Sequence, residues 1–232
     1  MTSTPITFQL FAKAPVPGSV KTRLHPALSF SDAAILHMRL VARAAAALEG
    51  VRETLPEAGL ELWCAPDCSH PALRSLAERH RLELRRQQGP DLGARMRHAL
   101  TAAMPGMAIL VGSDCPAIDS ALLRRAAVAL LDVDAVFVPA EDGGYALVGC
   151  RDRVADCFDG IAWSTAEVMR ETRSLLRAAS TRWVELPSVQ DVDTPADLAR
   201  LAADVRFSQL LDGLTVHASA GAAESIRTTT II

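Results

Sequence analysis

The sequence has few aromatic residues and no long hydrophobic run. Aromatic residues make up 4% of the 232 residues, and Tyr145 is the single tyrosine. No stretch approaches the ~20 apolar residues that a membrane-spanning helix needs, and no cationic leader precedes an apolar run of signal length. These absences predict a cytoplasmic protein without a membrane partner.

Neither the cysteine pattern nor the net charge indicates a metal knuckle or a nucleic-acid partner. The five cysteines are scattered and form no CxxC pair, so neither a disulfide framework nor a zinc knuckle is indicated. Lys and Arg number 24 against 27 Asp and Glu, for a net charge of -3. Without a basic field the chain has no general attraction for nucleic acid, so a phosphate-bearing ligand needs a local cluster of cations.

Two common nucleotide-binding signatures are missing. The chain contains no GxxxxGK[ST] loop and no GxGxxG fingerprint. The missing glycine fingerprint disfavours a hydride-transfer enzyme.

The hydrophobic pattern predicts an α/β fold. Hydrophobic residues make up 50% of the chain, which is enough for a sizeable core. Short apolar runs alternate with longer helical patterns, as in a parallel sheet with crossover helices. The expected strands are 6–11, 60–65, 82–86, 107–111, 135–139, 145–149 and 183–186. The expected helices are 32–49, 72–79, 93–103, 121–131, 166–178 and 195–203, with Ser31 and Gly50 capping the first and Ser164 the fifth.

The spacing of two late strands predicts one departure from a parallel sheet. Residues 140–144 are too few for a parallel crossover, so this pair is expected to form an antiparallel hairpin. We therefore expect one Rossmann-like α/β domain over residues 1–214, mostly parallel, with helices on both faces. Residues 215–232 are expected to form a tail outside the core.

Ligands of such sheets bind beyond the carboxyl ends of the strands, and a cation-rich loop follows the first strand. Pro15 and Pro17 stiffen this loop, and Gly18 lets its backbone come close to a ligand. We expect it to bind phosphates through Lys13, Gly18, Lys21 and Arg23. Lys21 and Arg23 would also stabilise charge that develops during a reaction.

Isolated acids follow two other strands. Asp114 comes directly after the buried run 107–111, where Mg²⁺ or Mn²⁺ is the natural partner of a lone carboxylate. Asp191 and Asp193 precede the helix that Thr194 caps, and either can support that helix or reach the same metal. We favour Asp193 as the second ligand because it is closer to the cap.

The turn between the two late strands reads as an ordinary hairpin or as an acceptor site. In the second interpretation Gly143 and Gly144 allow close approach, and Asp142 accepts a hydroxyl hydrogen bond or acts as general base. Tyr145 would line the same cleft. Trp163 is interpreted either as core or as a platform for the acceptor.

A further loop opens the third expected helix. Gln88 is placed to read the edge of a nucleobase stacked beside this glycine-bearing loop, which includes Gly93. Arg95, one turn into the helix, would add a phosphate contact. A plain turn is the alternative interpretation.

Together these segments resemble a known family. FAKAPVPGSVKTRL, GSDCP, DGGYALVG and the W-S-T and D-V-D-T-P segments, spanning about residues 6–201, are similar to the bacterial DUF2064 proteins. The resemblance implies a glycosyltransferase-A-like fold in the nucleotide-diphospho-sugar transferase superfamily, with members called arsenosugar-biosynthesis-type glycosyltransferases. The order of parts is also similar to sugar-nucleotide nucleotidylyltransferases and phospholactate guanylyltransferases. That likeness implies phosphate contacts from Lys13, Lys21 and Arg23 and a metal on Asp114 and Asp193, although the G-x-G-x-R start of the former is absent.

Three functions are therefore expected in order. The first is a metal-dependent glycosyltransferase that moves a sugar from a nucleoside-diphosphate sugar to a small-molecule acceptor. The second is a nucleotidylyltransferase, guanylyltransferase-like, that acts on a phosphorylated small molecule and releases pyrophosphate. The third is a nucleotide-binding module without catalysis.

Overall fold

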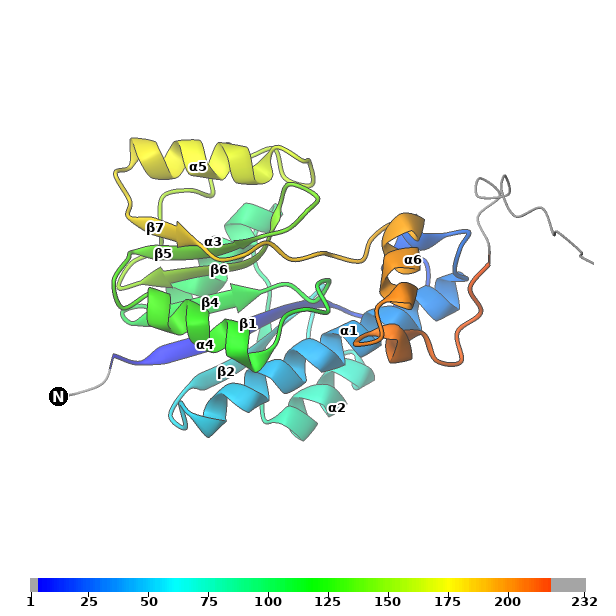
Figure 1. Cartoon of the computed structure of the whole chain (residues 1–232). Helices are drawn as coiled ribbons and strands as arrows, with labels where there is room; N and C mark the ends of the chain where they lie inside the picture. The colour runs from blue at the N-terminus through cyan, green and yellow to red at the C-terminus, as the bar shows by residue number, and fades with distance from the viewer. Residues whose placement is uncertain (1–3, 218–232) are drawn as a thin grey trace, which may run out of the picture.

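A computed structural model describes residues 4–217, which are organised around a seven-stranded sheet (Figure 1). The sheet order is β3-β2-β1-β4-β6-β5-β7. Only β6 runs antiparallel to its neighbours β4 and β5, and the remaining pairs are parallel. The strands are β1 (Ile6–Lys13), β2 (Gly59–Ala65), β3 (Glu83–Arg86), β4 (Met107–Val111), β5 (Ala135–Pro139), β6 (Tyr145–Arg151) and β7 (Trp183–Glu185). The expected fold class and its late hairpin are confirmed.

Helices cover both faces of the sheet, because apolar residues of the strands point alternately to each side. On β1, Phe8 and Leu10 face one core and Phe11 faces the other. The first core is covered by α1 (Phe30–Gly50), α2 (Pro71–His80) and α4 (Ser120–Ala129), and the second by α3 (Leu92–Ala102) and α5 (Val168–Ala178). A third cluster joins the first half of α1 to α6 (Pro195–Ala203) and η3 (Ser208–Leu211). None of the helices in these described residues is long and apolar enough to cross a membrane.

Three expected helix caps are wrong. The first helix begins earlier, because the side chain of Ser29 rather than Ser31 accepts the hydrogen bond from the Asp32 amide. Gly50 is still helical, and the chain passes directly into η2 (Val51–Glu53). Ser164 adopts φ 67°, and α5 instead follows Glu167. Residues 218–232 of the expected tail lie outside the described residues.

One edge of the sheet collects the loops that the sequence singled out. β1, β2, β4 and β5 end there, and β6 begins there because it is antiparallel. The segment after β7 then crosses this edge toward α6 (Figure 1), with the Val189 amide bonded to the Pro139 carbonyl and the Val192 amide bonded to the Asp114 carbonyl. The loops after β1, β4, β5 and β7 therefore meet at one place.

Candidate functional site

Lys21 and Asp114 form an ion pair at the centre of this edge. The Nζ atom of Lys21 lies 2.6 Å from Oδ1 of Asp114 and donates a hydrogen bond of 2.6 Å to the Val192 carbonyl. The lysine side chain is 3% exposed, whereas that of Asp114 is 53% exposed. Lys21 thus ties together the loops after β1 and β4 and the segment that crosses the edge.

A second ion pair joins Arg23 and Asp193. The guanidinium Nη1 lies 2.7 Å from Oδ2 of Asp193, in a more exposed setting than the Lys21 pair. The amide of Asp193 donates to the carboxylate of Asp197, which also completes the capping box of α6 with Thr194. The structure therefore gives each expected metal ligand a cation from the expected phosphate loop.

Asp191 is an unusual carboxyl beside these pairs. Burial, followed by the negative charge of Asp142, raises its pKa to about 6. Asp142 itself is exposed and accepts a 2.9 Å hydrogen bond from the Gly144 amide. The turn carboxylate and the crossing segment therefore lie near enough to interact, although they are far apart in sequence.

The donor set fits a metal ion only if the ligand supplies part of its coordination. Within residues 4–217, no group of three or more His, Cys, Asp or Glu side chains could hold a metal ion. Asp114, with either Asp193 or Asp191, offers one or two carboxylates. Mg²⁺ is commonly bound by one or two carboxylates together with phosphate oxygens and water. The residues thus fit an ion that binds with a phosphate-bearing ligand.

A cation-lined pocket of about 830 Å³ lies beside the end of β1. Its charged lining comes from Lys13, Arg86 and Arg95, and its other walls include Val16, Ser19, Gln87 and Gln88. The Nε atoms of Arg86 and Arg95 donate to the carbonyls of Pro66 and Gly89, which fixes the guanidinium groups. Lys13, Gln88 and Arg95 therefore come together as expected.

Sequence reasoning missed Arg86 and Gln87 in this pocket. Arg86 is the last residue of β3, so the rule that ligands bind beyond strand ends was the available signal. Gln87 is held by a 2.8 Å hydrogen bond from its Nε2 to the Trp63 carbonyl. Its neighbour Gln88 is exposed.

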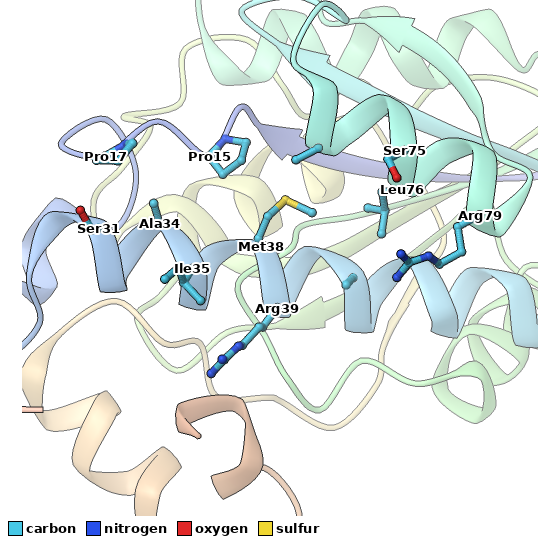
Figure 2. A pocket seen from close by; sticks show the side chains of 12 residues that line it. Pro15, Pro17, Ser31, Ala34, Ile35, Met38, Arg39, Ser75, Leu76 and Arg79 are labelled. Atoms are coloured by element: carbon cyan, nitrogen blue, oxygen red, sulfur yellow. The ribbon is translucent and has the colours of Figure 1, made fainter. Parts of the chain in front are cut away.

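The loop after β1 forms a wall between two hollows. Lys13, Ala14, Val16 and Ser19 face the cation-lined pocket, whereas Pro15 and Pro17 face a groove of about 620 Å³ over α1 and α2. Figure 2 shows the two prolines above α1, with Met38 and Leu76 between the helices. Gly18 adopts φ +78°, with open space where a Cβ would stand.

His37 supports the start of this loop and was not expected from the sequence. Its Nε2 lies 3.0 Å from the Lys13 carbonyl oxygen, and burial lowers its pKa. A neutral imidazole donating to this carbonyl holds the backbone from which Lys13 extends. The signal was weak, because His37 is one polar residue on an otherwise apolar helix face.

Trp163 and Tyr145 link the hairpin turn to α3. The indole of Trp163 packs over Gly93, and the rings of Tyr145 and Trp163 meet edge-on at 6.4 Å. Gly93 is thereby buried beneath the indole, away from the pocket surface where a nucleobase contact was expected. The hydroxyl of Tyr145 is buried without a hydrogen-bond partner among the described residues. Tyr145 therefore does not present this hydroxyl to a cleft, as the sequence had suggested.

Comparison with known proteins gives a consistent picture. The DUF2064 family, described as "Uncharacterized protein conserved in bacteria", matches residues 50–165. A candidate nucleotide-diphospho-sugar transferase from Desulfovibrio desulfuricans G20 is 33% identical, with a TM-score of 0.76 over 88% of this chain and 90% of that one. No curated protein matches the chain in sequence.

More distant structures share the fold. The 4-diphosphocytidyl-2C-methyl-D-erythritol synthase of Anaerococcus prevotii is 10% identical, with a TM-score of 0.54 over 86% of this chain and 97% of that one. The glucosyl-3-phosphoglycerate synthase of Mycobacterium tuberculosis, solved with Mn²⁺ and UDP, is 11% identical, with a TM-score of 0.51 over 93% of this chain and 82% of that one. At these identities the likeness concerns the fold alone.

Proposed function

The chain belongs to the bacterial DUF2064 family, and from that premise we propose that it is a metal-dependent glycosyltransferase. It would transfer a sugar from a nucleoside-diphosphate sugar to a small-molecule acceptor. The observation that carries this proposal is the meeting of Asp114, Lys21 and the segment 191–193 at one edge of the sheet, beside a pocket with three cations. The naming of the 33% identical relative as a candidate nucleotide-diphospho-sugar transferase supports it.

The pocket and the ion pairs would bind different parts of the nucleotide-sugar donor. Lys13, Arg86 and Arg95 offer the positive charge that a diphosphate needs, and Gln88 lies beside them to contact the base. Asp114, with Asp193 or Asp191, would hold Mg²⁺ or Mn²⁺ against the diphosphate. When bound, the metal would neutralise charge on the leaving diphosphate. Arg23 is close enough to Asp193 to share that task.

Acceptor activation is assigned to the hairpin turn. Asp142 is exposed at the same edge, and the Gly144 amide donates a 2.9 Å hydrogen bond to its carboxylate. The close approach of a ligand expected at Gly143 is wrong, because the Ala166 backbone already fills that side of the glycine. The Asp142 carboxylate lies close enough to Asp191 for its charge to raise the pKa of Asp191. Because Asp142 is the more exposed of the two, we assign to it the acceptance of a hydroxyl proton.

Nucleotidyl transfer is the second candidate. Three cations in one pocket match a nucleoside triphosphate at least as well as a diphosphate. In that reaction a phosphorylated small molecule attacks the α-phosphate, and pyrophosphate leaves. The fold shared with a diphosphocytidyl-methylerythritol synthase supports this alternative.

Product analysis distinguishes the candidates. Purified protein is incubated with Mn²⁺ and either nucleotide sugars or nucleoside triphosphates, together with a pool of small-molecule acceptors. Release of free nucleoside diphosphate from a nucleotide sugar supports glycosyl transfer, whereas pyrophosphate from a triphosphate supports the alternative. Nucleotide binding without either product favours a non-catalytic binding module.

Variants connect the product to the site. Asp114→Asn is expected to abolish product formation. Asp152→Asn is the matched control, since Asp152 follows β6 at the opposite edge of the sheet and its φ of 62° suits asparagine. Full activity in Asp114→Asn would contradict the proposed site.

A further inference from the structure

We propose that the ion pair between Lys21 and Asp114 must separate before either residue binds a ligand, and we call the closed pair the lock. In the closed pair, Asp114 is occupied by the ammonium group and Lys21 is occupied by the carboxylate. A phosphate that draws Lys21 away would free Asp114 for a divalent ion. The metal half of this inference rests on the proposed function, and the phosphate half does not.

The burial of the two partners is strongly unequal. Lys21 is 3% exposed and approaches Asp114 from inside the protein, while the carboxylate is 53% exposed. A lysine ammonium has three donors; the ammonium of Lys21 pairs with Asp114 and donates to the Val192 carbonyl. The open side of Asp114 lets a metal approach the pair, whereas a phosphate reaches the remaining donor of Lys21 only by drawing the buried ammonium outward.

The backbone at Lys21 fits a residue held in place for function. Lys21 adopts φ 50°, ψ 33°, a left-handed conformation that non-glycine residues seldom occupy. Such strain persists only where the surroundings impose it, and the ion pair with Asp114 and the hydrogen bond to Val192 are that constraint. Lys13 and Arg23 differ, because Lys13 is exposed and Arg23 is 71% exposed.

Electrostatics couples the two ligands through this pair. A divalent cation and the Lys21 ammonium repel each other strongly when both contact the Asp114 carboxylate. A metal ion that binds without phosphate must therefore displace Lys21. An arriving phosphate supplies the negative charge that draws Lys21 away from Asp114 and offsets the repulsion between the ammonium and the metal. Phosphate and metal therefore strengthen each other's binding, and the effect is reciprocal by thermodynamic linkage.

The first experiment measures Mn²⁺ binding by isothermal titration calorimetry without nucleotide. Lys21→Met should bind Mn²⁺ about 10-fold more tightly than the wild type, within the roughly 5–150-fold range of typical coupling. Lys13→Met removes a nearby cation that makes no ion pair with Asp114, and it should change the affinity much less. Unchanged or weaker binding in Lys21→Met would overturn the metal half.

The second experiment measures pyrophosphate binding in chelator-treated, metal-free buffer. Asp114→Asn should bind pyrophosphate several-fold more tightly, because Lys21 is released. Asp142→Asn removes an equal charge from the same edge but no partner of Lys21, so its gain should be smaller. Because Asp114→Asn leaves the buried Lys21 without its carboxylate partner, circular dichroism must first verify that the variant keeps the wild-type fold.

The two experiments separate failure of the lock from failure of the proposed function. Absence of Mn²⁺ binding in both wild type and Lys21→Met would contradict metal dependence. The pyrophosphate affinities would still test whether the Lys21–Asp114 pair must separate. Equal pyrophosphate affinity in Asp114→Asn and Asp142→Asn would overturn the lock.

Discussion

Gly93 lies directly beneath the indole ring of Trp163. A Cβ built on Gly93 would stand 2.5 Å from the Cζ2 atom of that ring, which is closer than any real contact. Gly93 is the second residue of α3, and Trp163 lies in the segment that leads to α5. The absence of a side chain at position 93 therefore sets how closely the segment before α5 packs on α3.

The effect of Gly93→Ala on the free energy of unfolding should change sign with the residue at position 163. In the wild type, Gly93→Ala should destabilise the fold by about 1–3 kcal/mol, because the methyl group overpacks against the indole. In a Trp163→Ala background the space is open, and the same change should be neutral or stabilising by roughly 0.5–1 kcal/mol from helix propensity. Urea unfolding of the four proteins measures this cycle. Equal destabilisation in both backgrounds would refute the packing argument.

The hairpin turn should depend on Gly143 more than on another glycine of similar conformation. Gly143 has φ +92°, and a Cβ there would stand 2.1 Å from the Ala166 carbonyl oxygen. Gly160 has φ +73° and open space. Gly160→Ala should cost only the conformational penalty of roughly 1–2 kcal/mol, whereas Gly143→Ala should cost more and shift Asp142. Comparable melting temperatures for the two variants would contradict this account.

The ion pair between α5 and β7 should make stability pH-dependent. Bidentate hydrogen bonds from Arg173, at 2.7 and 2.8 Å, lower the pKa of Glu185 from its usual 4.5. A carboxyl with a depressed folded pKa stabilises the protein above its unfolded pKa and loses that contribution as pH falls through the folded value.

Glu185→Gln tests that sign. It should reduce the free energy of unfolding by about 1 kcal/mol at pH 7, a modest value because the pair is partly exposed. The difference should shrink steadily below pH 4.5 in urea titrations. Glu167→Gln on the exposed start of α5 is the control and should have little effect at either pH. A Glu185→Gln deficit that grows on acidification would contradict the assignment.

Local signals predicted most of the fold. The uniformly apolar run of β4 and the proline at the start of α6 gave bounds that agree with the structure. The five-residue spacing before Tyr145 gave the hairpin. Errors arose where two local signals competed, as for Ser29 and Ser31, which can each cap a helix.

The sequence indicated which residues share one edge of the sheet, but not how their side chains pair. Strand ends indicated which loops meet, and hence Lys13, Asp114 and Asp142. No local pattern shows that Lys21 turns inward to Asp114, since that contact joins positions 93 residues apart and depends on the crossing segment at Val192. The roles of Lys21, Asp193 and Arg23 in binding remain predictions.

The account is tested most directly by nucleotide binding in the presence and absence of Mn²⁺. A thermal-shift panel of nucleoside diphosphates, triphosphates and nucleotide sugars is measured for the wild type and Asp114→Asn. At 100 times its dissociation constant, a cognate nucleotide should stabilise the wild type by about 2.7 kcal/mol. That gain should require Mn²⁺ and be lost in Asp114→Asn. If no nucleotide stabilises the wild type, or if Asp114→Asn responds to the metal-loaded nucleotide as the wild type does, the account is contradicted.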